Sequence, residues 1–196
     1  MTLTKAAPSI SLAKGAGAGG QMRINLNWTQ PPPAKGFFKR ATSSAVDLDL
    51  GCLWETTDGA KGVVQALGNA YGNLHAAPYV QLDADDRSGQ SVGGENLTVN
   101  LDRLDQIRRI LVFAYIYEGA PSWASADGVV TLHPVGAQPI EVRLDETDDK
   151  RFCAIALLTN EGGSLRIQRE VRYVAGWQQE LDAAYGWGMN WTPASK

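Results

Sequence analysis

The nine residues VDLDLGCLW, at positions 46–54, alternate apolar and polar side chains with the period of a β-strand. One face of this predicted strand is apolar and consists of Val46, Leu48, Leu50, Cys52 and Trp54. Asp47 and Asp49 fall on the other face, about 6–7 Å apart. Like charges at that distance repel unless water or a cation lies between them. The pattern therefore allows two interpretations: a solvated outer face of a surface strand, or half of a cation site.

Strand-like segments continue along the chain on both sides of this stretch. Segments with strand period or strand composition are a short one within SISLAKG (9–15) and those at 22–28, 79–82, 97–101, 110–117, 128–133, 140–144, 153–159 and 164–173. The run 110–117 is apolar throughout, as expected for a strand covered on both faces. Asp58-Gly59 predicts a hairpin turn.

A single helix is expected near the C-terminus, because Trp177, Leu181, Ala184 and Tyr185 recur at helical spacing. Gly186 is placed to cap its end. Many short strands and one helix predict an all-β fold, a two-sheet β-sandwich with one short C-terminal helix. With 196 residues, the chain is expected to form a single domain, 1–196, around one core.

Composition restricts the class of partner and the compartment. The net charge is −3, which gives no general electrostatic reason to bind nucleic acid or an anionic membrane. No apolar run approaches the ~20 residues of a membrane span, and the first residues lack the apolar region of a secretory signal. We therefore expect a cytoplasmic protein that does not bind nucleic acid.

Enzymatic motifs are not found in the sequence. It contains no Gly-x-Ser-x-Gly, no His-Glu-x-x-His and no paired cysteines. His75 lies in a loop-like segment and His133 precedes a proline, so structural or solvent-exposed roles are expected for both. Cys52 and Cys153 lie in apolar runs and are predicted to be free, buried thiols. The sequence thus favours a non-enzymatic protein.

An acidic loop, QLDADDRSGQSVGGENLT at 81–98, could complete a cation site with the paired aspartates. Its acidic residues are Asp83, Asp85, Asp86 and Glu95. Calcium needs six to eight oxygen ligands, which a flexible loop of this composition can supply, and magnesium fits less well. An EF-hand is excluded because Arg87 and Gly94 occupy ligand positions of that motif. A solvated acidic turn is the alternative.

Five stretches, taken in order, resemble the TerD/TerA family of tellurium-resistance and stress-response proteins. They are SISLAKG, VDLDLGCLW, SVGGENLTVNLDRL, IRRILVFAYIYEG and GWQQELDAAYGW. The resemblance spans most of the chain and implies a calcium-binding β-sandwich without established enzymatic chemistry. It also implies partners among other tellurite- and stress-resistance proteins, with membrane contact only indirectly through them.

The resemblance also implies a set of metal ligands. Matched residue by residue, these are Asp47, Asp49, Asp83, Asp85, Asp86, Glu95 and Asn96. The family pattern continues after its Asn-Leu-Thr with an acid-rich insert that supplies ligands, whereas here Thr98 runs straight into Val99. The implied calcium site is therefore incomplete, and a metal-free relative is the other interpretation.

Six tryptophans suggest a second class of function, since exposed aromatic rings form the platforms of sugar-binding sandwiches. Trp28 and Trp54 fit apolar strand faces and are expected in the core. Trp123, Trp187 and Trp191 are less obviously buried, although packing of the C-terminal segment on the sandwich is favoured. The alternative to a tellurium- and stress-resistance domain is thus a carbohydrate- or small-ligand-binding β-sandwich.

Overall fold

The computed structural model describes residues 9–12, 19–29, 45–83 and 93–192. Its strands are β1 (Ser9–Leu12), β2 (Gln21–Asn27), β3 (Asp47–Thr56), β4 (Lys61–Val64), β5 (Gly72–Asn73), β6 (Val80–Leu82), β7 (Glu95–Asn100), β8 (Ile107–Glu118), β9 (Gly128–His133), β10 (Ile140–Leu144), β11 (Phe152–Glu161) and β12 (Ser164–Val174). Two α-helices are present in this part of the chain, α1 (Trp123–Ala126) and α2 (Gln178–Tyr185), with 3₁₀ turns at Leu67–Asn69 and Leu101–Gln106.

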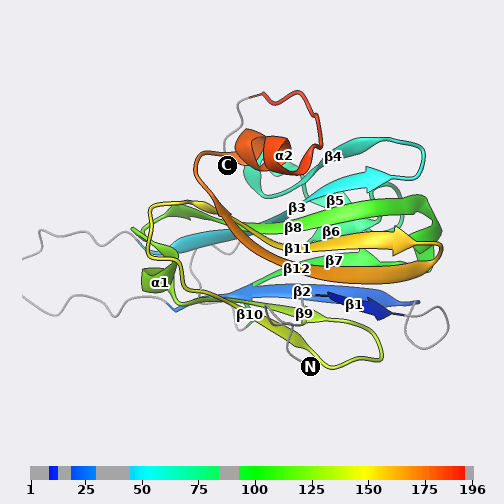
Figure 1. Cartoon of the computed structure of the whole chain (residues 1–196), viewed down its shortest axis with the longest axis horizontal. Coiled ribbons are helices and arrows are strands. Elements are labelled where there is room, and N and C mark those ends of the chain that lie inside the picture. Colours follow the sequence, from blue (N-terminus) through cyan, green and yellow to red (C-terminus); the bar gives the residue numbers. More distant parts are fainter. Residues whose placement is uncertain (1–8, 13–18, 30–44, 84–92, 193–196) are drawn as a thin grey trace, which may run out of the picture.

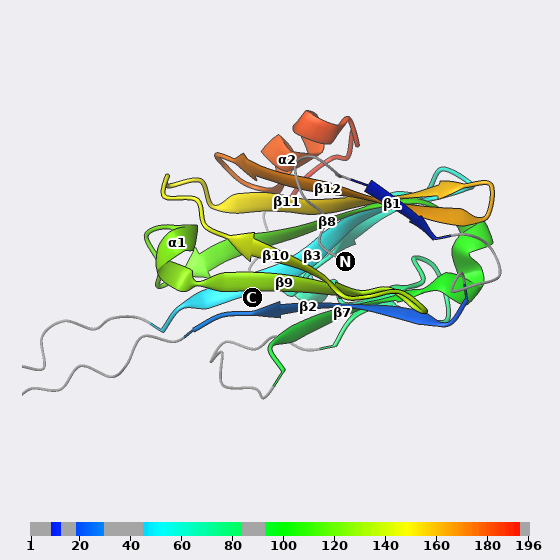
Figure 2. The same cartoon turned by 60° about the horizontal axis from the view of Figure 1, so that its bottom comes forward.

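The strands form two six-stranded antiparallel sheets packed face to face (Figures 1 and 2). The first sheet has the order β1-β12-β11-β8-β3-β4, and the second has the order β10-β9-β2-β7-β6-β5. The predicted all-β sandwich with one C-terminal helix is confirmed. Helix α1 is only four residues long and was not expected from the sequence.

The main core lies between the two sheets and contains the predicted apolar face of β3. Val46, Leu48, Leu50 and Cys52 are buried there, and Trp54 packs partly buried against them. Both cysteines are free and fully buried, as predicted, and burial raises the pKa of each thiol well above its usual range.

A second apolar layer covers the outer face of the first sheet, so the expectation of one core is incomplete. Figure 2 shows α2 on the side of this sheet that faces away from the second sheet. The layer consists of Leu53, Leu67, Leu111, Phe113, Tyr115, Phe152, Ala154, Leu181 and Trp187. The predicted double coverage of β8 is confirmed, because the main core covers one face and the C-terminal region covers the other.

Two glycines mark the ends of elements on this side of the fold, one at the β3–β4 hairpin and one after α2. The hairpin between β3 and β4 turns at Asp58-Gly59, where Gly59 has φ 87°, a conformation that glycine adopts readily. Helix α2 ends at Gly186, the left-handed C-cap with φ 62°. The chain then folds back over the sheet, and the indole of Trp187 donates to the carbonyl of Trp54 at 3.1 Å.

A buried carboxylate and two partly exposed arginines form an ion pair, and Arg109 joins it to the C-terminal region. Glu55, 2% exposed, accepts hydrogen bonds from Arg108 at 2.7 Å and from Arg109 at 2.6 Å. The guanidinium of Arg109 also lies 3.8 Å from the ring centroid of Trp187. Burial alone would raise the pKa of Glu55, but the hydrogen bond and charge of Arg109 and the charges of Arg108 and Lys61 outweigh it and lower that pKa.

The Glu55→Gln variant should be less stable than the unsubstituted chain by about 1–3 kcal/mol at neutral pH, because Arg108 and Arg109 lose their charged hydrogen-bond acceptor. A lowered pKa in the folded state means that Glu55 stabilises the fold above its unfolded pKa of about 4.3, and this contribution disappears as pH falls through the folded pKa. Urea unfolding from pH 7 to pH 3 should therefore show the two proteins converging in acid. A constant difference would contradict this account.

Candidate functional site

Three carboxylates are buried near the start of β3. Asp47 is 3% exposed, Asp49 is 0% exposed, and Glu95 at the start of β7 is 0% exposed. We call these residues the acidic cluster. The interpretation of Asp47 and Asp49 as a solvated outer face is therefore wrong, since the face of β3 that carries them is covered like the opposite one.

The acidic cluster forms at an edge of β3 that β4 leaves open. Strand β4 pairs with β3 only from Cys52 to Glu55. The backbone N–H of Leu50, beyond the end of that pairing, donates to the Glu95 carboxylate at 2.7 Å. Glu95 belongs to the second sheet, so its side chain crosses the interface between the sheets. A carboxylate from one sheet thereby completes the hydrogen bonding of a strand in the other.

Tyr115 of β8 adjoins the acidic cluster. It is the register partner of Asp49 and is fully buried, with its ring stacked 4.8 Å from that of Phe152. Burial raises the pKa of Tyr115, and the charge of Asp49 and then those of Glu95 and Asp47 raise it further, well above its usual range. A neutral phenol therefore stays in contact with negative charge. Tyr115 lies within an apolar run, where no sequence pattern marks it as a site residue.

The remaining predicted ligands do not all reach this place. Asp83 is exposed and accepts hydrogen bonds from the backbone N–H of Asn96 at 3.0 Å and from its side-chain amide at 2.8 Å. The Asn96 oxygen accepts in turn from Arg23 at 3.1 Å and Asn25 at 3.0 Å. Because Glu95 and Asn96 are adjacent in β7, their side chains point to opposite faces. The structure therefore divides the predicted set in two.

Asp85 and Asp86 lie outside the described residues. Within the described ranges, no group of three or more Asp, Glu, His or Cys side chains is arranged to hold a metal ion. The acidic cluster supplies carboxylate oxygens, the donors that calcium prefers. It thus fits calcium in donor chemistry, but it is not assembled as a coordination site.

The histidines are not part of the acidic cluster, whereas the indole of Trp28 donates at 2.9 Å to the carbonyl of Val46, the residue before Asp47. The Nε2 of His133 lies 3.1 Å from Arg23 on the outer face of the second sheet, and burial and the charge of Arg23 lower the pKa of His133. Of the tryptophans, Trp28, Trp123 and Trp187 are buried, so they offer no exposed platform. Packing of the C-terminal segment on the sandwich, which the sequence favoured, is observed.

Two solved structures share the fold of this sandwich. One is a homologue of the telluride resistance protein TerD from Streptomyces coelicolor A3(2), with TM-score 0.60 and 20% identity over 87% of this chain and 98% of that one. The other is a protein of unknown function, SAV2460, with TM-score 0.60 and 16% identity over 83% of this chain and 92% of that one. The fold is therefore that of a TerD homologue.

Sequence similarity then identifies the relatives. Tellurium resistance protein TerA from Alcaligenes sp. is 50% identical over an alignment of 199 positions, which covers 100% of this chain and 58% of TerA. The chain thus spans about 58% of the length of that relative. No protein-family model matches the chain. Similarity in sequence and in fold confirms the resemblance of this chain to the TerD/TerA family of tellurium-resistance proteins.

The two α-helices of the described residues are short, four and eight residues long. None of the helices in these ranges is long and apolar enough to cross a bilayer.

Replacing Glu95 tests the link between the acidic cluster and β3. In Glu95→Ala the buried N–H of Leu50 loses its acceptor, which should reduce stability by about 1–3 kcal/mol. Glu95→Gln keeps an acceptor oxygen and removes a charge that repels Asp49, so its loss should be clearly smaller. Urea unfolding of both variants measures the difference. Equal losses would show that the hydrogen bond to Leu50 contributes nothing.

Proposed function

We propose that this chain is a non-enzymatic tellurium-resistance domain that acts in the cytoplasm through other proteins of the tellurite and stress response. The observation that carries the proposal is the 50% identity to a tellurium resistance protein along the whole chain. The fold of a TerD homologue supports it independently.

A binding role rather than a catalytic one is supported by the chemistry of the described residues. His133 is held by Arg23 on the outer face of the second sheet. Burial and raised pKa values keep both cysteines protonated and therefore poorly nucleophilic. The conspicuous polar groups in the interior are carboxylates, which suit cation binding better than nucleophilic attack.

Calcium binding at the acidic cluster is the finer part of the proposal. Three buried carboxylates at one end of β3 concentrate negative charge in a place that water screens poorly. A divalent cation would reduce their repulsion and would draw Asp47, Asp49 and Glu95 together. Three carboxylates carry six oxygens, the lower end of the six to eight that calcium takes, and one Glu95 oxygen already accepts from the Leu50 N–H, so the affinity should be modest.

Calcium should raise the melting temperature of the chain more than magnesium does. A ligand that binds only the folded state adds about 2.7 kcal/mol of stability at a hundredfold excess over Kd. In the double variant Asp47→Asn, Asp49→Asn, calcium should raise the melting temperature no more than magnesium does. Differential scanning fluorimetry and titration calorimetry with millimolar calcium measure both effects.

Asp83→Asn is the matched control, because it removes one carboxylate on the opposite face of the second sheet. It should keep the calcium response that Asp47 and Asp49 provide. If the unsubstituted chain shows no response, or if Asp83→Asn abolishes it and the double variant does not, calcium binding at the acidic cluster is wrong.

The tellurium-resistance role itself is tested in cells. The chain is expressed in a bacterium that carries the other tellurite-resistance proteins but lacks this one, and the inhibitory concentration of tellurite is measured. Resistance should rise with the unsubstituted chain and should fall back when the fold is disrupted by a buried charge, Leu111→Asp. A well-expressed, folded chain that gives no protection would overturn the proposal.

A further inference from the structure

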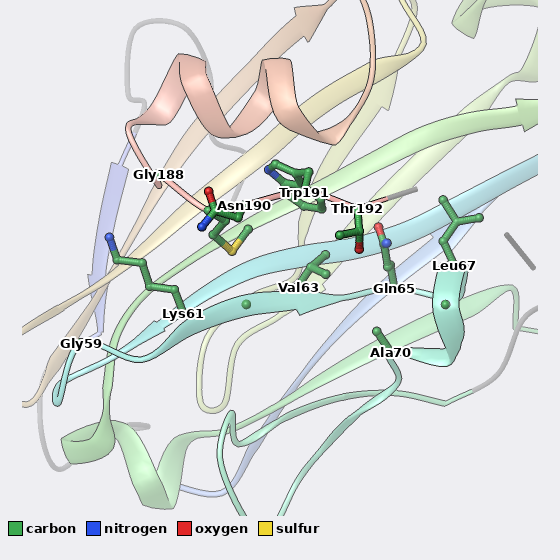
Figure 3. Close-up of a pocket in the computed structure, with 13 residues that line it drawn as sticks. Gly59, Lys61, Val63, Gln65, Leu67, Ala70, Gly188, Asn190, Trp191 and Thr192 are labelled. Carbon is green, nitrogen blue, oxygen red and sulfur yellow. The ribbon is translucent and has the colours of Figure 1, made fainter. Parts of the chain in front are cut away.

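A groove runs between the free edge of β4 and the C-terminal segment Gly188–Thr192 (Figure 3). Its volume is about 550 Å³, within the range of ligand-binding pockets. Lys61 lies at one end of the groove and Leu67 at the other, with Val63 between them on β4. Trp191 and Asn190 face them from the C-terminal segment.

The edge of β4 presents backbone groups that the sheet does not use. Strand β4 is the last strand of its sheet. The Thr56 N–H donates to the Ala60 carbonyl, so these two residues form a hydrogen-bonded pair next to the β3–β4 ladder. Hydrogen-bonded and non-hydrogen-bonded pairs alternate along an antiparallel ladder. The N–H and C=O of Lys61 and Val63 therefore point away from β3. Within the described residues, no backbone hydrogen bond is formed from these outward groups.

The opposite wall of the groove is fixed by a buried carboxylate. Asp182, 5% exposed, accepts hydrogen bonds from the backbone of Gly188 at 2.7 Å and of Met189 at 2.9 Å, and from the indole of Trp191 at 3.0 Å. These bonds hold the C-terminal segment in place. The groove is therefore preorganised, which reduces the entropy lost when a ligand binds.

The groove also carries a positioned charge. Lys61 is the one charged residue among those that line it, and its ammonium donates to the Trp187 carbonyl at 2.8 Å. An ammonium has three donors, so further bonds remain available to a carboxylate. The other side chains that line the groove are uncharged, with Val63 and Trp191 in facing positions.

We propose that this groove binds an extended peptide segment of a partner protein, which adds to β4 as a further strand and places an acidic side chain at Lys61. Backbone groups of alternate residues at an open strand edge match an extended chain, and a neighbouring pocket supplies side-chain specificity. The positive charge of Lys61 favours an acidic residue. This inference rests on the proposed function in one respect, the expectation that the chain acts through protein partners.

The first test uses the folded chain and a labelled probe, acetyl-Thr-Val-Glu-Val-Thr-Val-amide. Binding should saturate, and NMR should show the amide signals of Lys61 and Val63 shifting and exchanging more slowly with solvent. A probe with Lys in place of Glu should bind about two- to fivefold more weakly, the range of an exposed ion pair. A backbone N-methylated probe should not bind.

Variants of β4 separate backbone pairing from simple contact. Val63→Pro removes an N–H that points away from β3, and proline is tolerated at such edge positions, so the melting temperature should change little while binding weakens by more than about tenfold. Val63→Thr keeps the N–H and should keep binding. Should Val63→Pro not fold, Trp191→Ala removes the facing indole and should also weaken binding.

Three outcomes would overturn the proposal: no saturable binding of any probe, binding unaffected by N-methylation and Val63→Pro, or a preference for monosaccharides that shift Trp191 but not Val63. A chain that protects cells from tellurite but binds no peptide would overturn this inference and leave the proposed function intact. A chain that binds the probe but gives no protection would overturn the proposed function and leave the peptide-binding inference intact.

Discussion

Burial of both faces of β3 is the constraint on which the polar chemistry of this protein depends. The sheet that contains β3 lies between the inter-sheet core and the layer formed with α2 and Trp187. Charged side chains on β3 therefore cannot simply turn to solvent, and each needs a specific environment. Glu55 is neutralised by two arginines, whereas Asp49 lies beside Tyr115 and close to Glu95.

The short length of β4 explains where the acidic cluster forms. Had β4 continued alongside all of β3, a strand partner would satisfy the N–H of Leu50. Because β4 stops pairing at Cys52, that donor is available to Glu95, and a carboxylate from the second sheet is held at the edge of the first. One edge of a sheet thus brings together residues that lie 45 positions apart in the sequence.

The same short strand creates the second feature of functional interest. Exposed strand edges tend to pair with other chains, and proteins usually protect them. Here the edge of β4 is flanked by a segment that Asp182 fixes. The C-terminal segment leaves the edge of β4 open, but a partner can reach it only through the groove. The acidic cluster therefore depends on how little of β3 is paired by β4, whereas the groove depends on β4 being the last strand of its sheet.

Much of the fold could be predicted from local patterns, because they depend on neighbours in sequence. The alternation from Val46 to Trp54 fixed which side chains share a face, Asp58-Gly59 fixed a hairpin, and Gly186 ended α2. The candidate site could be predicted only in part. The sequence placed Asp47, Asp49 and Glu95 in one set of predicted ligands, but their burial follows only from the packing of the two sheets.

The environment of each face was decided by the tertiary structure. The sequence places Asp47 and Asp49 opposite the apolar face of β3, but whether water or protein covers them depends on distant residues, such as Phe152, whose ring stacks on Tyr115, the register partner of Asp49. Likewise, Glu95 and Asn96 are neighbours in the chain and were assigned to one site. Strand geometry sends their side chains to opposite faces, and only the packing of the sheets shows that one face is interior and the other is exposed.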